Sequence, residues 1–378
     1  MTTAAPLRPT SLEPVVGHTR GRLAHVTPNW FTTVMGTGIV ATSAATLPAH
    51  VAGLHTVATV VWAVASLTLL AVTVAFVAHW SLHRAQARRY LDHGVVSHFY
   101  GAPAMAVMTV GAGTLLFGAD LMGTTTAVRV DAMLWTVGTV IGVVAVGFVV
   151  ARLCTRADRG GAAVPARMMS VVAPMVSAST GALLVPHIAD ADLRLAFLML
   201  CYLLFGVSFV FGTATAFVVY RRLLRVGLPA RDAVPTVWIP LGMIGQSITA
   251  AITLGTVSRG EFAGARSVAS GPVAADLHTA GVAYGVVVGT LGIVAFAVSA
   301  TVTARAAHSG LPFSLTWWSF TFPIGTCVTG ATALGTATGV GAIHTTAVVL
   351  YVLLFSAWLV VAARTVAGIR SGALPAAA

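Results

Sequence analysis

The chain has 378 residues, of which 57% are apolar and only 8% are charged, and its mean hydropathy is +0.91. An average soluble domain carries about 25% charged residues. A chain of this length needs far more polar surface to stay dissolved in water, so a soluble globular protein is excluded and lipid is the expected solvent.

Eight long stretches contain no Asp, Glu, Lys or Arg, and they give the candidate membrane spans. A spanning helix needs about 20 apolar residues at a rise of about 1.5 Å each. Six stretches have room for one helix, whereas the stretches of 61 and 58 residues, 23–83 and 306–363, have room for two each. The alternating polarity of a membrane β-barrel is absent. The sequence therefore predicts an all-α integral membrane protein with ten transmembrane helices.

In chain order, the predicted spans are 28–46, 54–78, 101–119, 132–152, 168–187, 195–219, 236–256, 278–303, 317–338 and 343–364. They predict a ten-span domain over 28–365, flanked by an N-terminal tail, 1–27, and a C-terminal tail, 366–378.

The charged residues indicate the orientation. With the N-terminus in the cytoplasm, 17 of the 21 basic residues and four of the ten acidic residues fall in cytoplasmic segments. Basic residues concentrate on the cytoplasmic side of membrane proteins. We therefore expect a multi-pass protein of the cell (cytoplasmic) membrane with both termini in the cytoplasm.

Composition also argues against several partners. The basic residues lie in short loops between spans, where topology explains them, so we expect no nucleic acid partner. No Cys or His array has the spacing of a metal site, and Cys154, Cys201 and Cys327 lie in or at the ends of spans. We expect no metal, no cofactor and no disulfide.

The prolines repeat along the chain. Four odd-numbered spans carry a proline inside or just within the apolar run, whereas the even-numbered spans have no interior proline. The four are Pro103, Pro174, Pro240 and Pro323. Proline removes a backbone donor and crowds the carbonyl four residues earlier. We interpret the pattern as five helical hairpins, each joining a bent odd helix to a straight even helix, with the odd helices around a common axis.

The odd spans also hold the polar side chains that we expect along this axis. Gln246 has an amide side chain in the middle of a span, and it either faces the axis or forms an interhelical hydrogen bond. The candidate pore-lining residues are Thr37, Pro103, Thr109, Pro174, Ser177, Pro240, Gln246, Ser319, Pro323 and Thr326.

The expected path is uncharged inside and basic at its mouth. No predicted span has an interior carboxylate, Arg or Lys, although proton-coupled pumps commonly place an ionisable group there. An uncharged tunnel with an electropositive cytoplasmic mouth favours anions over cations. The absence of carboxylates from the spans supports this inference more strongly than the arginines do, because membrane topology alone predicts arginines on the cytoplasmic side. The expected mouth residues are Arg84, Arg88, Arg89, Arg221 and Arg222.

Three segments of the sequence resemble one known family. They are TPNWFTTVMGTG at 27–38, FYGAPAM at 99–105 and WWSFTFP at 317–323, of which the last is the most specific. Together they resemble the tellurite-resistance/dicarboxylate transporter family, which includes bacterial TehA, fungal malate and sulfite transporters and plant slow anion channels. The resemblance extends from about residue 28 to residue 364.

This resemblance implies five helical hairpins around a central pore, assembled as a homotrimer with one pore per protomer. It also implies that the phenylalanine before the proline of the ninth span plugs the pore, and here that residue is Phe322. An aromatic ring in a narrow apolar throat blocks ions sterically and excludes water. Ordinary packing beside a proline is the alternative role for Phe322.

We therefore expect a non-enzymatic transporter of small anions, either a C4-dicarboxylate such as malate, or sulfite, with Phe322 as the gate. A chloride or nitrate channel and a tellurite-resistance permease are alternatives. A membrane redox enzyme that uses haem or quinone is a further alternative. It would need paired histidines within the bilayer, whereas the histidines of this chain, such as His79, His98 and His187, cluster at predicted span ends.

Overall fold

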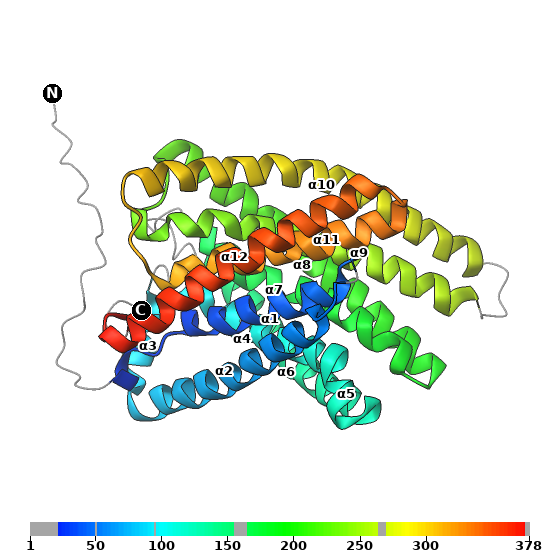
Figure 1. Ribbon diagram of the computed structural model, residues 1–378, viewed down its shortest axis with the longest axis horizontal. Coiled ribbons are helices and arrows are strands. Elements are labelled where there is room, and N and C mark those ends of the chain that lie inside the picture. Colours follow the sequence, from blue (N-terminus) through cyan, green and yellow to red (C-terminus); the bar gives the residue numbers. More distant parts are fainter. Residues whose placement is uncertain (1–21, 50, 94–95, 155–164, 264–269, 375–378) are drawn as a thin grey trace.

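The computed structural model describes residues 22–49, 51–93, 96–154, 165–263 and 270–374 (Figure 1). Within these ranges every regular element is a helix, and eight helical segments are long and apolar enough to cross a membrane. The prediction of an all-α, multi-pass membrane protein is therefore confirmed.

The longer helices fall into two sets that alternate along the chain. The first set, which we call the inner helices, comprises α1 (Phe31–Thr46), α4 (Ala102–Gly113), α7 (Met168–Leu184), α9 (Ile239–Ala263) and α11 (Thr321–Thr338). The second set, the outer helices, comprises α2 (Leu54–Leu82), α6 (Thr124–Cys154), α8 (Ala191–Val226), α10 (Ser270–His308) and α12 (Gly341–Ser371). Each outer helix packs against the inner helix that precedes it. The short helices are α3 (Arg84–Asp92) and α5 (Ala119–Met122), and a π-helix, Thr114–Gly118, joins α4 to α5.

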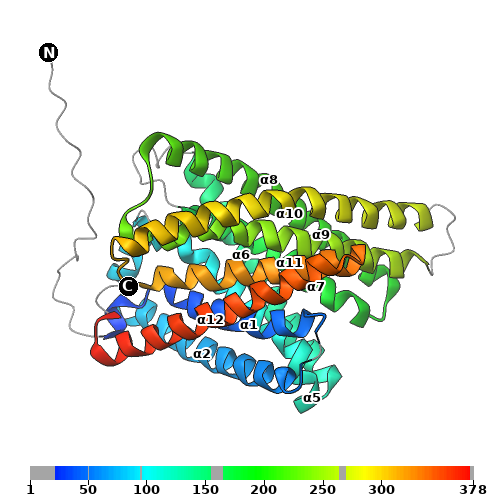
Figure 2. The ribbon, with the colours of Figure 1, turned by 45° about the horizontal axis from the view of Figure 1, so that its top comes forward.

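The inner helices contact one another in a closed ring, in the order α1, α4, α7, α9, α11 and back to α1. They occupy the middle of the bundle, with α2 and α10 at its edges (Figure 1 and Figure 2). In the most apolar part of the segment that contains α7, 89% of the residues are buried, against 11% in the corresponding part of α10. The outer helices therefore direct most of their apolar side chains away from the protein, where lipid is expected.

The inner helices α1 and α11 are not among the eight spanning segments. They have 16 and 18 residues, and both are rich in threonine and glycine. Protein surrounds these two helices on most sides, and 14 of the 16 residues of α1 are buried. Because a helix inside a ring meets neighbouring helices instead of lipid, it can be shorter and less apolar than a helix that lipid surrounds.

A 3₁₀ turn precedes each inner helix, and the prolines mark the junction. Pro103 and Pro240 are the second residues of α4 and α9, and Pro323 is the third residue of α11. In its first turn a helix has no intrahelical partner for the backbone N–H, so a proline there breaks no helical hydrogen bond. The prediction of bends at these three prolines is wrong, and of the four prolines only Pro174 lies inside its helix. The turns are η2 (Pro28–Trp30), η3 (Val96–Gly101), η5 (Pro165–Arg167), η7 (Arg231–Trp238) and η8 (Leu315–Phe320).

These 3₁₀ turns form a second closed ring, in the order η2, η3, η5, η7, η8 and back to η2. All five inner helices therefore begin at the same end of the bundle and run in the same direction. A helix N-terminus carries a partial positive charge of about half an elementary charge. The backbone alone thus makes this end of the ring electropositive.

The predicted tails are only partly described. Residues 1–21 and 375–378 lie outside the described residues. Leu23, in the 3₁₀ turn η1 (Arg22–His25), is joined to α2, because its carbonyl oxygen lies 2.8 Å from Nδ1 of the buried His79. At the other end, α12 continues to Ser371, beyond the predicted boundary at 365.

Candidate functional site

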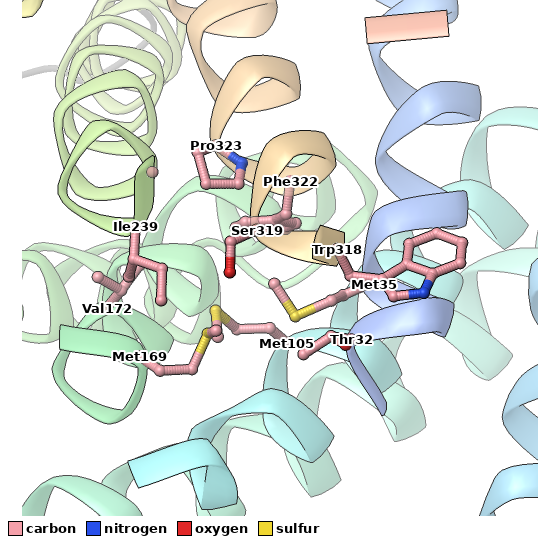
Figure 3. Close-up of a pocket in the computed structure, with 11 residues that line it drawn as sticks. Thr32, Met35, Met105, Met169, Val172, Ile239, Trp318, Ser319, Phe322 and Pro323 are labelled. Carbon is pink, nitrogen blue, oxygen red and sulfur yellow. The ribbon is translucent and has the colours of Figure 1, made fainter. Parts of the chain in front are cut away.

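A small cavity lies inside the ring, at the end where the inner helices begin (Figure 3). All five inner helices contribute to its wall, together with η8. Its volume is about 10 Å³, which is close to the minimum that holds one water molecule. The space inside the ring is therefore very small at this level. The lining residues are Thr32, Met35, Met105, Met169, Val172, Ile239, Gly242, Trp318, Ser319, Phe322 and Pro323.

Phe322 lies in the wall of this cavity and is 3% exposed. It is the second residue of α11, directly after η8, so the junction between the 3₁₀ turn and the helix positions its ring. Ser319 and Pro323, on either side of it in the chain, line the same cavity (Figure 3). Phe322 also belongs to one continuous apolar cluster with Met35 and Met105.

Three methionines reach the cavity from three different inner helices, Met35 from α1, Met105 from α4 and Met169 from α7 (Figure 3). No residue that lines the cavity carries a formal charge. Thioether side chains are unbranched and adopt many shapes, so they can repack around a ring that moves. The wall of this small cavity is therefore uncharged and mostly apolar.

Three of the predicted site residues meet at this cavity, namely Phe322, Ser319 and Pro323. The other predicted pore-lining residues lie in the inner helices but do not line it, and these are Thr37, Pro103, Thr109, Pro174, Ser177, Pro240, Gln246 and Thr326.

The hydroxyl groups among these other residues are engaged within or between helices. Thr109 donates to the carbonyl oxygen of Met105 at 2.7 Å, and Thr326 donates to that of Pro323 at 2.8 Å. Thr37 donates to the carbonyl oxygen of Thr33 and accepts a hydrogen bond from Trp358 of α12. Serine and threonine in spanning helices commonly bond their own backbone in this way.

Ser177 and Gln246 connect inner helices to their neighbours. Ser177 of α7 contacts the sulfur of Met108 in α4, with Oγ and Sδ 3.1 Å apart. Gln246 of α9 donates from its side-chain amide to Oγ of Ser179 in α7. Of the two alternatives for Gln246, the structure shows the interhelical hydrogen bond.

The five predicted mouth arginines all lie outside the cavity wall. Arg84, Arg88 and Arg89 belong to α3, and Arg221 and Arg222 lie near the end of α8. The more buried cation is a different residue, and it lies in the ring of 3₁₀ turns. Arg167 is the N-cap residue of α7 and is only 5% exposed.

Arg84 lies in a groove on the side of the bundle, with Phe76, Trp80 and Tyr100 as neighbouring lining residues. The groove has a volume of about 400 Å³ and is separate from the closed cavity. The groove is lined by residues of α2, by Arg84 at the start of α3 and by Tyr100 of η3, so Arg84 lies away from the cavity wall.

One carboxylate contradicts the expectation of spans without interior charges. The predicted span 132–152 leaves out Asp131, but this residue lies in α6 and is 1% exposed. Its side chain packs against α4, where a Cβ added to Gly111 would lie 2.6 Å from the Asp131 carboxylate oxygen Oδ1. Asp131 does not line the cavity, so the cavity wall itself remains free of acidic side chains.

Sequence reasoning did not find the three methionines, Thr32 or Trp318 as lining residues. Their shared feature is position, because each lies in the first five residues of an inner helix or in the turn that precedes it. The signal in the sequence is the proline near the start of α4, α9 and α11, because the residues of these segments that line the cavity lie within five positions of it.

Comparison with known proteins gives a family and several relatives. A family model described as SLAC1, voltage-dependent anion channel, matches residues 25–366. Sulfite efflux pump SSU1 of Arthroderma otae is 24% identical over 312 residues, which are 82% of this chain and 81% of that protein. SSU1 of Trichophyton rubrum gives the same identity and the same coverage. An uncharacterized transporter of Methanocaldococcus jannaschii is 25% identical over 349 residues, 91% of this chain and 94% of that protein.

The family match covers every inner helix, all five 3₁₀ turns that precede them and the whole cavity wall. The relatives are transporters by name, which agrees with a chain whose described part is mostly membrane-spanning helix. The chain therefore belongs to the SLAC1 family of voltage-dependent anion channels, the tellurite-resistance/dicarboxylate transporter group of anion transporters that its motifs resemble.

Proposed function

We propose that this protein moves small anions across the membrane along the axis of the inner helices. The observation that carries the proposal is the closed ring of α1, α4, α7, α9 and α11 around a cavity that no charged side chain lines. Because α1 and α11 complete the ring, we propose that both also cross the membrane. The chain then has ten spans in five helical hairpins.

Sulfite is the first candidate substrate, because the SSU1 relatives are named sulfite efflux pumps. A C4-dicarboxylate such as malate is the second. A dicarboxylate ordinarily meets a fixed cation at its binding site, and no lining residue supplies one. A chloride or nitrate channel and a tellurite-resistance permease are the other candidate functions.

Phe322 is the gate in this proposal. Its ring is 3% exposed in the wall of a cavity of about 10 Å³, so no anion passes while the ring and its neighbours stay in place. A change of rotamer, together with repacking of the flexible methionines, widens the throat without a change of backbone fold.

The apolar surface of the outer helices supports a proposal for the assembly. Large apolar side chains are exposed on the outer helices, for example Leu67, Leu203 and Ile293 at 69%, 63% and 72%. We propose that lipid and neighbouring protomers of a homotrimer cover this surface in the cell membrane, with both termini in the cytoplasm. The electropositive end of the ring then faces the cytoplasm.

The proposal is tested by flux into proteoliposomes that contain the purified full chain. Sulfite, malate, nitrate and chloride are supplied in turn, with and without a proton gradient. Phe322→Ala is expected to raise the flux of the permeant anion by about tenfold or more, which corresponds to a barrier lower by about 1.4 kcal/mol. Unchanged flux in a correctly inserted Phe322→Ala protein refutes the gate.

Phe320→Ala is the matched control, since Phe320 packs against Trp238 and Trp317 and does not line the cavity. Its flux is expected to stay near that of the unmodified protein. Absence of flux for every anion in both the unmodified protein and Phe322→Ala refutes anion transport. An absorbance spectrum with a Soret band would instead indicate a haem enzyme.

A further inference from the structure

Every inner helix contributes residues near its N-terminus to the wall of the cavity that Phe322 lines. Each lining residue outside η8 lies within the first five residues of its inner helix, as Thr32 and Met35 do in α1 and Ile239 and Gly242 do in α9. None of the five helices has an acidic residue in its first turn. The positive ends of five helix dipoles therefore lie around the cavity, and the acidic residue that precedes α9, Asp232, lies in the turn η7.

One hydroxyl group in the cavity wall has no partner. Ser319 is 4% exposed, and its Oγ forms no hydrogen bond with any described residue. Its Oγ points into the cavity, towards the methionine side chains (Figure 3). A buried polar group without a partner is destabilising, so a ligand in the cavity that accepts a hydrogen bond from this hydroxyl would remove that cost.

The other side-chain donors of the wall are already used. Thr32 donates to the carbonyl oxygen of Asn29 at 2.6 Å, and the indole N–H of Trp318 donates to Oγ1 of Thr365 at 3.1 Å. The remaining lining residues have no side-chain O–H or N–H group. Ser319 is thus the one lining side chain whose donor is available to a ligand in the cavity.

We propose that the cavity lined by Phe322 and Ser319 is a binding site for the permeating anion. The Ser319 hydroxyl donates a hydrogen bond to the anion, and the N-termini of the five inner helices supply the positive potential. This inference rests on the proposed function. The ligand class is a small inorganic anion, such as sulfite or nitrate, that has lost part of its hydration shell. Positive backbone charge offsets that loss without a fixed cation, which would hold the anion too tightly for passage.

The size of the cavity couples this site to the gate. A volume of about 10 Å³ accepts no hydrated anion, so the site fills only when the Phe322 ring or the methionines move away. Truncation of Phe322 is therefore expected to expose the site permanently. For this reason the site is tested in the Phe322→Ala protein.

The first test measures sulfite and nitrate flux against concentration in proteoliposomes with Phe322→Ala. Adding Ser319→Ala is expected to raise the half-saturating concentration by about tenfold, the effect of one lost hydrogen bond to a charged group. Ser319→Thr keeps a hydroxyl donor and is expected to restore saturation at low concentration. Equal half-saturating concentrations for Ser319→Ala and the parent overturn the proposal.

Ser170→Ala is the matched control. Ser170 is equally buried and lies in the first turn of α7, but it donates to the carbonyl oxygen of His98 and does not line the cavity. Its removal is expected to lower the melting temperature and to leave the half-saturating concentration unchanged. A tenfold rise in this control as well would show a general loss of structure and overturn the assignment to Ser319.

The second test does not depend on transport. Nitrate or sulfite is added to detergent-purified Phe322→Ala, and the melting temperature is expected to rise with anion concentration. Ser319→Ala is expected to remove most of that rise, and Ser319→Cys, a weaker donor, to give an intermediate rise. A rise that is identical in all three proteins overturns the site. A rise that depends on Ser319 in a protein without flux keeps the site and refutes the proposed transport function.

Discussion

Asp131 illustrates how one residue can differ from its expected role. Its side chain is buried between α6 and α4, and no described residue donates a hydrogen bond to either carboxylate oxygen. Burial of a charge without partners is destabilising. Because Asp131 faces Gly111 of α4 instead of the cavity, we attribute no part of the anion path to it.

The variant Asp131→Asn tests this assignment. The amide has the shape of the carboxylate and carries no charge, so the melting temperature is expected to rise, by an amount equivalent to about 1–3 kcal/mol. Anion flux in the Phe322→Ala background is expected to stay the same. Calorimetry and the flux assay check the two outcomes.

Asp190→Asn serves as the control for Asp131→Asn. Asp190 is the N-cap residue of α8 and accepts a hydrogen bond from the backbone N–H of Leu193 at 2.8 Å. Loss of this charge at a helix N-terminus is expected to lower stability by about 0.3–1 kcal/mol. A lower melting temperature or lost flux in Asp131→Asn would show that its buried carboxylate is required.

At the scale of elements, the ring depends on close approach between its helices. A Cβ added to Gly245 of α9 would lie 2.5 Å from the backbone nitrogen of Cys327 in α11. Backbone atoms have little freedom to move, so only glycine allows this approach. The contact between α9 and α11 is one of the five that close the ring.

Gly245→Ala is therefore expected to push α9 and α11 apart and to destabilise the protein by about 1–3 kcal/mol, as overpacking of a core does. The control is Gly206→Ala in α8, where nothing lies within 4 Å of an added Cβ. This control is expected to raise stability by about 0.5–1 kcal/mol, because alanine favours a helix. Thermal unfolding in detergent measures both, and equal effects would contradict the close packing of the ring.

At the scale of the whole molecule, positive charge has two sources. The chain has a net charge of +11, and the N-termini of the inner helices converge at one end. Exposed arginines act over the Debye length, about 10 Å at 0.1 M salt and about 3 Å at 1 M. The helix N-termini act at the cavity itself, where water and salt do not screen them.

Neutralising the exposed arginines separates these two sources. Replacement of the five mouth residues by glutamine is expected to lower anion flux several-fold at low salt and much less at 1 M salt, because salt already screens their effect. The proteoliposome assay at two ionic strengths measures this difference. Equal losses at both would indicate misfolding or altered topology. The five residues are Arg84, Arg88, Arg89, Arg221 and Arg222.

The sequence by itself determined the class of the protein and the approximate bounds of its helices. Membrane helices are local features, since each must be apolar along its own length whatever surrounds it. The predicted span 28–46 became η2 and α1, and the predicted span 54–78 became α2 (Leu54–Leu82). The motif around Phe322 also indicated the family that the comparison confirmed.

The tertiary structure decided what the prolines and the polar residues do. The sequence around Pro323 does not distinguish a proline that bends a helix from a proline that lies in its first turn. The structure does, because the 3₁₀ turn η8 ends at Phe320 and α11 begins at Thr321. Ser319 and Ser177 are both serines in inner segments, yet only Ser319 reaches the cavity. Such differences depend on which segments, distant in the chain, lie side by side in the closed ring, and no local pattern of residues records that.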